Sequence, residues 1–184
     1  IAGQPMVNYP IAVANSIGSL RPIVVVGHGA AEVRQAIGES VSYALQSPQL
    51  GTGHAVLCAR EQIDLTSEFV VVLYGDTPLI TTETLQRLIA AHVQSAAAVS
   101  LITFKPHDPA LYGRILRDDH NRIVDIIEYK EATSEQRAIN EVNSGIFCYK
   151  TEWLLAHLDR LTPRPGHGEL YLTDLVNIAA KEGA

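Results

Sequence analysis

Apolar residues along the chain gather in short β-branched runs that alternate with segments of helical spacing. The first run, PIVVV at 22–26, is followed by two glycines and by apolar residues at helical spacing within 27–40, which predicts a strand, a turn and a helix. Residues 41–47 form a second predicted strand that ends at a Ser-Pro pair, and 53–63 form a second predicted helix. The strand and helix unit therefore repeats.

A third unit follows. Residues 68–76, EFVVVLYGD, are almost continuously apolar, as expected for a central parallel strand that is covered on both faces. The next segment predicts a helix, because its apolar face recurs at i, i+3, i+4 and i+7 and includes one histidine: Leu85, Leu88, Ile89 and His92.

The second half of the chain adds a hairpin to this alternation. After a predicted strand at 97–104, residues 113–117 and 122–129 read as two strands joined by the turn residues 118–121. Residues 133–136 have the Thr-x-x-Gln form of a capping box, which predicts the start of a short helix.

The last segments return to the alternation. A strand is predicted at 143–149 and a helix at 153–161, ending near Pro163. A loop rich in glycine and proline at 163–168 leads to a final predicted helix within 169–183, which a glycine ends.

This pattern predicts an α/β fold in one domain over residues 1–184, with a doubly wound, mostly parallel, Rossmann-like sheet and a β-hairpin insertion. Ligands of such sheets bind beyond the carboxyl ends of the strands. We therefore expect residues 27–29, 46–53 and 74–76 to lie on one rim, although they are far apart in the sequence.

Composition narrows the class of protein. The chain is 47% hydrophobic and 18% charged, carries a formal net charge of −6 and shows no run of Lys or Arg, which fits a soluble globular protein and argues against a nucleic-acid surface. Cys58 and Cys148 lack metal-ligand spacing, so we expect reduced thiols. With no secretory signal and no long apolar run, a cytoplasmic location without membrane contact is expected.

The stretch QSPQLGTGHAV places Gln46 ahead of a Gly-Thr-Gly turn. Gly51 and Gly53 would let backbone N–H groups approach a flat or anionic ligand closely, because no Cβ stands in the way. Gln46 could pair with the N3–H and O4 of a uracil edge. A plain turn with a solvated glutamine explains these residues equally well.

Asp76 follows the apolar run 68–75, at the expected carboxyl end of its strand. A carboxylate there could hold a Mg²⁺ that bridges nucleotide phosphates. Its structural alternative is a cap for the turn that begins at Thr77. The shared rim with the glycine loop favours the metal.

Other polar residues give weaker signals. Glu128 and Asn143 could hydrogen-bond sugar hydroxyls, although singly a strand end and a turn explain them better. The histidines beside glycines lack metal-ligand spacing: His28, His54 and His167. Two hairpin cations could attract a sugar phosphate, although such charges are usually only solvated: Arg114 and Lys130. Hydrolase and P-loop motifs are absent from the sequence.

Five motifs together resemble a known family. LGTGHA, LYGDTPLI, YGRI, EYKEATSEQRAINEVNSGI and GELYLTD occur in this order. They closely resemble the uridylyltransferase domain of the bacterial bifunctional enzymes that make UDP-N-acetylglucosamine, a nucleotide-diphospho-sugar transferase fold. The resemblance covers almost the whole chain.

The resemblance implies a role for each matching residue. Gln46 would read the uracil. The residues that would line the nucleotide cleft are Gly51, Thr52, Tyr74 and Gly75. Asp76 would be a catalytic ligand of Mg²⁺. The N-acetylglucosamine moiety would be bound by Gly113, Glu128 and Asn143.

The implied reaction joins UTP and N-acetylglucosamine 1-phosphate into UDP-N-acetylglucosamine and pyrophosphate, for cell-wall precursor synthesis. It needs alignment and charge neutralisation rather than covalent help. Alternatives are a related sugar-1-phosphate nucleotidyltransferase and a catalytically incomplete module that binds nucleotide sugars. The full-length family protein is expected to form a homotrimer.

Several family features fall outside the resemblance. They are an initial strand with a basic Gly-rich loop, a later metal-binding asparagine and a left-handed β-helix for acetyl transfer. The match ALYG at 110–113 also lacks the usual glycine before Tyr-Gly. Because the initial strand would lie mid-sheet, we expect two unpaired strand edges. We therefore expect either a longer natural protein or a neighbouring or shifted strand in the slot.

Overall fold

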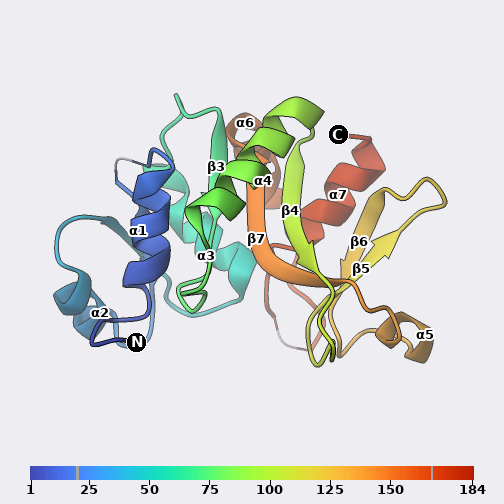
Figure 1. Ribbon diagram of the computed structural model, residues 1–184, viewed down its shortest axis with the longest axis horizontal. Coiled ribbons are helices and arrows are strands. Elements are labelled where there is room, and N and C mark those ends of the chain that lie inside the picture. Colours follow the sequence, from blue (N-terminus) through green and yellow to red (C-terminus); the bar gives the residue numbers. More distant parts are fainter. Residues whose placement is uncertain (20, 167) are drawn as a thin grey trace.

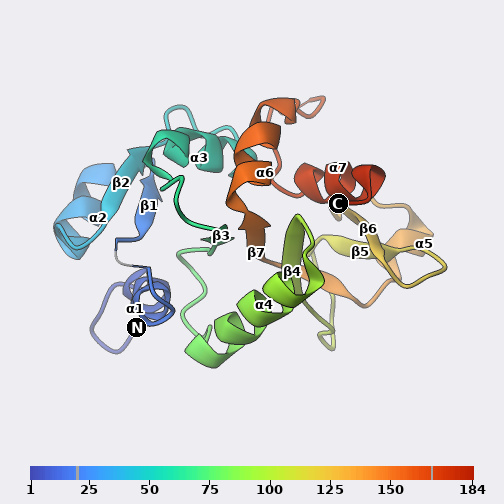
Figure 2. The ribbon, with the colours of Figure 1, turned by 90° about the horizontal axis from the view of Figure 1, so that it is seen from above.

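The computed structural model describes residues 1–19, 21–166 and 168–184, and its strands form two separate sheets. Figure 1 labels the strands of the larger sheet, and Figure 2 labels those of both. Strands β1 (Ile23–Val26) and β2 (Ser42–Leu45) pair in parallel and form the first sheet. The second sheet has five strands: β3 (Phe69–Val72), β4 (Val99–Phe104), β5 (Arg114–Arg117), β6 (Ile123–Ile127) and β7 (Val142–Lys150).

Strand β7 is the centre of the five-stranded sheet. It pairs antiparallel with β3 on one side and with β4 on the other, and its first residue also pairs with β5. Strands β3 and β4 run in the same direction, and β7 lies between them in the opposite direction. The α/β class and the β5–β6 hairpin are confirmed.

Two expectations about the sheet are corrected. We expected 68–76 to be the central strand, but β3 pairs only with β7 among the described strands. We also expected mostly parallel pairing, whereas only β1 and β2 pair in parallel in the part of the chain that is described. The physical reason is that an apolar run reports burial but not the direction of its neighbours.

Helices cover both faces of the five-stranded sheet (Figure 2). Phe147 and Tyr149 of β7 point toward a core built with α3, α6 and α7, whereas Ile146 and Cys148 point toward α1 and α4. This alternation is the two-residue period of a strand. The helices are α1 (Asn8–Ser16), α2 (Ala30–Ile37), α3 (Thr52–Ala59), α4 (Thr82–Ser95), α5 (Ser134–Arg137), α6 (Thr151–His157) and α7 (Asp174–Glu182), with the 3₁₀ turns η1 (Arg60–Gln62) and η2 (Leu158–Arg160).

Local sequence signals place several helix ends correctly. The capping box between Thr133 and Gln136 opens α5, and Gly183 ends α7 with a left-handed backbone at φ 68°. Residues 169–173 precede the last helix, which begins at Asp174 rather than at 169. Helix α1 was not predicted. None of the described helices has the length and apolar character that a membrane crossing requires.

The two sheets are not joined by strand pairing. Strand β1 pairs only with β2, and β3 pairs only with β7, so each has one edge without a strand partner among the described residues. These are the two unpaired edges that the sequence led us to expect. All four residues of β3 are only half-buried, although all four are apolar.

Candidate functional site

Gln46 lies at the carboxyl end of β2, where its backbone N–H donates to the carbonyl of Val26 at 2.8 Å. Its side chain is held from within the chain: Nε2 donates to the Gly51 carbonyl at 2.9 Å and lies 3.2 Å from Nδ1 of His54. Only 9% of the residue is exposed. Both amide hydrogens therefore have partners, and the Oε1 oxygen is the atom left to accept a bond from a ligand.

A hollow of about 300 Å³ lies beside Gln46. It is bounded by two segments that follow strands β1 and β2: Gly27 and His28, and the run from Leu45 to Gln49. A Cβ at Gly27 would stand 2.5 Å from Nε2 of Gln49, so the exposed Gln49 side chain lies directly against Gly27. The hollow has the minimum size of a ligand pocket and lies on the rim predicted from the strand ends.

The Gly-Thr-Gly segment, in which Gly51 is the N-cap and Thr52 and Gly53 begin α3, packs against the segment before α7. Gly53 N donates to the Leu170 carbonyl at 2.7 Å, and Leu172 N donates to Oγ1 of Thr52 at 3.0 Å. A Cβ at Gly51 would stand 2.6 Å from the Leu170 oxygen, and φ of Gly51 is +92°. The glycines thus permit close packing of two chain segments, a structural need that exists without any ligand.

Tyr74 connects the two ends of the site. A Cβ at Gly145 would stand 1.9 Å from Cε2 of Tyr74, so the ring occupies the space that a side chain at this position of β7 would need. Burial raises the pKa of Tyr74, the charges of Glu128 and Asp76 raise it further, and a hydrogen bond with Thr52 opposes the shift. Tyr74 therefore lies close to the glycine turn, to Asp76 and to Glu128 at once.

The three predicted sugar residues come from β7, from the residue before β5 and from the residue after β6, yet they lie together. Asn143 N donates to the Gly113 carbonyl at 2.9 Å, and a Cβ at Gly113 would stand 3.5 Å from each carboxylate oxygen of Glu128. Asn143 Oδ1 accepts from Gly145 N at 2.9 Å. The Asn143 amide NH₂ has no partner among the described residues, so it can donate to a ligand.

The electrostatics of Glu128 come from burial and from several charges. Burial raises the pKa of Glu128, as do Glu131 and Asp174, whereas Arg164 and the nearby Thr173 hydroxyl lower it. Sequence reasoning missed both Arg164 and Thr173. The motif GELYLTD contained Thr173, but no signal distinguished Arg164 from the other residues of its predicted loop.

Asp76 lies in an exposed turn after β3. The structure does not support its alternative role as a cap: the Thr77 hydroxyl closes the turn on the Tyr74 carbonyl at 2.7 Å, and Thr81 caps α4. No group of three or more metal-binding side chains occurs among the described residues. A single carboxylate still suits Mg²⁺, which often takes one or two carboxylates and completes its shell with phosphates and water.

Arg114 does not have the free charge that a phosphate site needs. It is 2% exposed and donates to the carbonyls of Pro109, Ala110, Tyr112 and Arg137. Its suggested role as a phosphate-binding or solvated cation is therefore wrong. Arg114 holds the loop that leads into Gly113.

The remaining weak candidates are accounted for as far as they are described. His28 lines the hollow, His54 contacts Gln46, and Lys130 is exposed. His167 lies outside the described residues. Burial raises the pKa of the Cys58 thiol, and raises that of Cys148 to about 12, so neither is an activated nucleophile.

Sequence comparison relates the chain to one family. The family model described as "Nucleotidyl transferase" matches residues 1–184. The chain is 47% identical over 186 residues to the bifunctional protein GlmU of Trichlorobacter lovleyi and 45% identical over 183 residues to that of Heliobacterium modesticaldum. Each alignment covers the whole chain and 40% of the relative, so the chain spans about two fifths of the length of these relatives.

Structural comparison supports the fold. A crystal structure of UDP-glucose pyrophosphorylase complexed with UDP-glucose superimposes with a TM-score of 0.75 at 17% sequence identity, covering 97% of this chain and 75% of the other. The apo form of a UDP-glucose pyrophosphorylase gives a TM-score of 0.74. The architecture of mixed sheets and covering helices is therefore a known one.

Proposed function

Because the chain belongs to the nucleotidyl transferase family, we propose that it forms the site that joins UTP and N-acetylglucosamine 1-phosphate into UDP-N-acetylglucosamine and pyrophosphate. One observation carries the proposal. Gln46 donates to the Gly51 carbonyl next to Thr52, and Tyr74 lies near Thr52, Asp76 and Glu128. The groups proposed for the base, the phosphates and the sugar thus occupy one rim.

At the base end, Oε1 of Gln46 would accept a hydrogen bond from N3–H of uracil. The amide hydrogens of Gln46 are held by Gly51 and His54, so they are not the donors to O4. Cytosine has no hydrogen on N3 and would present an acceptor to an acceptor. This arrangement therefore predicts a preference for UTP over CTP.

At the sugar end, Glu128 would accept from sugar hydroxyls while the Asn143 amide NH₂ donates. Gly113 leaves room beside the Glu128 carboxylate because it has no Cβ. The phosphate oxygen of the sugar phosphate would attack the α-phosphorus of UTP, with pyrophosphate leaving. The chain contributes alignment of the two substrates, which is the larger part of such catalysis.

Between the two ends, Asp76 would hold a Mg²⁺. The ion, when bound, neutralises charge on the phosphates. The exposed turn lets the carboxylate face solvent and substrate, and no described side chain competes for it. The family resemblance also leads us to propose a cytoplasmic location, a role in cell-wall precursor synthesis and a trimeric full-length protein.

The proposal is tested by measuring pyrophosphate release with UTP or CTP, each paired with N-acetylglucosamine 1-phosphate or glucose 1-phosphate. We expect the highest rate with UTP and the N-acetylated sugar. A preference for glucose 1-phosphate would favour a related transferase instead. Equal rates with UTP and CTP would remove the assignment of Gln46. Binding of UDP-N-acetylglucosamine without turnover would favour a module that only binds.

A matched pair of variants tests the metal ligand. Asp76→Ala should lower the rate by about two orders of magnitude and leave the unfolding midpoint within a few degrees, because Asp76 contacts no described side chain through a hydrogen bond. Asp119→Ala removes an equally exposed aspartate from the hairpin turn and should change neither. Loss of folding in Asp76→Ala with a normal rate would assign Asp76 a structural role.

A further inference from the structure

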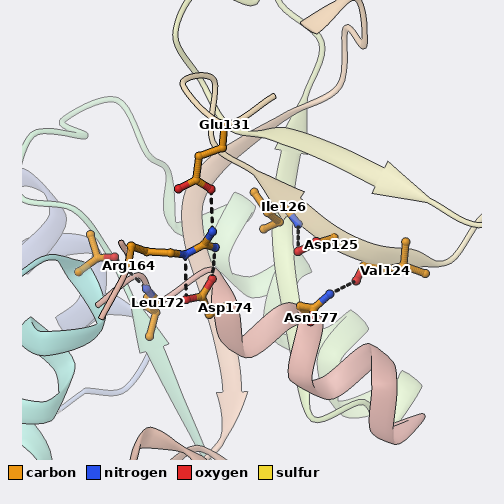
Figure 3. A network of polar contacts seen from close by, with 9 residues as sticks. Val124, Asp125, Ile126, Glu131, Arg164, Leu172, Asp174 and Asn177 are labelled. Atoms are coloured by element: carbon orange, nitrogen blue, oxygen red, sulfur yellow. Dashed lines mark hydrogen bonds and ion pairs between the residues drawn. The ribbon is translucent and has the colours of Figure 1, made fainter. Parts of the chain in front are cut away.

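Arg164 joins two segments of the chain that are far apart in sequence. Its Nη1 donates to Oε2 of Glu131 at 2.6 Å, and its Nη2 and Nε donate to the two carboxylate oxygens of Asp174 (Figure 3). Glu131 lies in the turn after β6, and Asp174 is the first residue of α7. The guanidinium thus forms a bridge between the hairpin and the last helix.

Both anchors of this bridge adjoin residues at the sugar end of the site. The turn with Glu131 starts at Glu128, whose carbonyl accepts from Glu131 N at 2.9 Å and from Ala132 N at 3.1 Å. Asp174 follows Thr173, which is 5% exposed and lies close enough to Glu128 to lower its pKa. Fixing Glu131 and Asp174 therefore fixes the backbone turn that begins at Glu128 and the helix start that lies beside its side chain.

Arg164 is itself held in place. Its backbone N–H donates to the Glu169 carbonyl at 2.8 Å, and its carbonyl accepts from Gly168 N at 3.0 Å. Its guanidinium carbon lies 5.4 Å from the centroid of the Tyr171 ring. The side chain is 27% exposed. A held, forked guanidinium fixes geometry better than a flexible surface ion pair does.

Arg164 is also the cation within a group of carboxylates. Burial raises the pKa values of Asp125 and Glu128 and the charge of Asp174 raises them further, whereas the charge of Arg164 lowers both. Several charged or titratable groups face Glu128 from the elements around it: Tyr74, Glu131, Arg164, Tyr171 and Asp174. Arg164 is the one cation in this set, so its removal would disfavour the ionised form of Glu128.

We propose that Arg164 is a positioning residue for sugar recognition: by bridging Glu131 and Asp174, it holds the Glu128 carboxylate over Gly113. The inference rests on the proposed function. It assigns Arg164 no contact with the substrate. Replacing Arg164 should therefore weaken the binding of UDP-N-acetylglucosamine but not the binding of UDP, which lacks the sugar.

The test compares the affinities for UDP-N-acetylglucosamine and UDP, measured by calorimetric titration at pH 7.5 for the unaltered chain and for variants. Arg164→Gln should weaken UDP-N-acetylglucosamine binding about tenfold and change UDP binding less than twofold. Arg164→Lys keeps the charge but loses the fork, so it should weaken sugar binding about threefold. Arg160→Gln is the matched control, because Arg160 also pairs with a glutamate, Glu182, but does not face Glu128.

A pH series separates positioning from general damage to the fold. UDP-N-acetylglucosamine should bind more tightly than UDP only while Glu128 is ionised. Because the charge of Arg164 lowers the pKa of Glu128, this difference in affinity should disappear at a higher pH in Arg164→Gln than in the unaltered chain. UDP binding should show no such change. If Arg164→Gln does not fold, the threefold loss in Arg164→Lys decides the question.

The outcomes distinguish the two proposals. If the unaltered chain binds UDP-N-acetylglucosamine no better than UDP, the proposed sugar site fails, and this inference fails with it. If the sugar contribution is present and survives in both Arg164 variants, only the role of Arg164 is refuted. Equal weakening of UDP and UDP-N-acetylglucosamine would also refute it, because that result indicates a general loss of structure.

Discussion

The two sheets contain similar apolar runs but bury them to different extents. Phe147 of β7 is 0% exposed, whereas three of the four residues of β1 and all four of β3 are only half-buried. Strand β7 has partners on both edges and helices on both faces, while β1 and β3 each lack a strand on one edge among the described residues. The comparison teaches that the burial of a strand depends on its neighbours as much as on its own sequence.

The candidate site draws on both sheets. Gln46 follows β2 of the two-stranded sheet, whereas Tyr74, Gly113 and Asn143 belong to the five-stranded sheet or to the loops next to it. None of the residues of α2, which follows β1, is buried. The elements around the base end of the site are therefore less buried than those around the sugar end.

The largest expected effect tests this difference in burial. Phe147→Ala should lower the free energy of unfolding by about 3–5 kcal/mol, because it empties space in a core that cannot collapse fully. Val24→Ala in β1 should cost about 1 kcal/mol or less, because its side chain is only half-buried. Urea denaturation measures both. Similar losses would show that the two sheets contribute equally to stability.

A smaller effect is expected at Gly145, which lies in β7 where the register with β4 shifts. Gly145→Ala would place a Cβ 1.9 Å from the Tyr74 ring at φ +79°, and should cost about 2–3 kcal/mol through strain and displacement of the ring. Gly166→Ala is the control, because Gly166 has φ +87° but nothing within 4 Å of a Cβ. It should cost about 1 kcal/mol. Equal costs, measured in urea, would mean that Tyr74 moves away freely.

Much of the fold could be predicted from local patterns. Strand β1, helix α4 and the β5–β6 hairpin were anticipated because burial imposes a period on their sequences. The central position of β7 could not be predicted, because it depends on which other strands pair with its two edges, and the sequence of β7 itself does not state this. The run NSGIFCY is no more apolar than EFVVV, yet it is the one that lies between two strands.

The site could be predicted less completely than the fold. The residues at strand ends were found from topology and from resemblance, and their proximity follows from the common rim. The hydrogen bonds of the Gln46 side chain to Gly51 and His54 depend on the path of the chain between residues 46 and 54, and the spacing of residues in the sequence does not predict that path. Arg164 was missed for a similar reason, since its partners Glu131 and Asp174 come from separate elements.

A third prediction concerns the ion pair between Arg117 of β5 and Glu141, which directly precedes β7. Glu141 accepts from Arg117, which lowers the pKa of Glu141 from about 4.5 to about 2, and Thr103 and Lys105 help to lower it. The contribution of the ionised Glu141 to the free energy of unfolding is therefore complete above pH 4.5 and is lost as the pH falls toward 2. Glu141→Gln should cost about 1 kcal/mol at pH 7. It should also flatten the stability curve between pH 4.5 and 2, which urea melts would show.

The smallest effect should come from His92, on the face of α4 that packs against the five-stranded sheet. Burial lowers the pKa of His92, and the charge of Lys150 lowers it further. Since the unfolded chain has the ordinary histidine pKa of about 6.5, it binds the proton first as the pH falls. Stability should therefore be full above pH 6.5 and decline below it, in a pH range higher than that of Glu141. Hydrogen exchange can locate the effect: amides of α4 and β4 should lose protection between pH 7 and 5.5, after correction for the intrinsic rates, while those of β1 and β2 do not. Equal loss in both sheets would mean that they unfold as one cooperative unit, and the contrast between them would then concern burial but not stability.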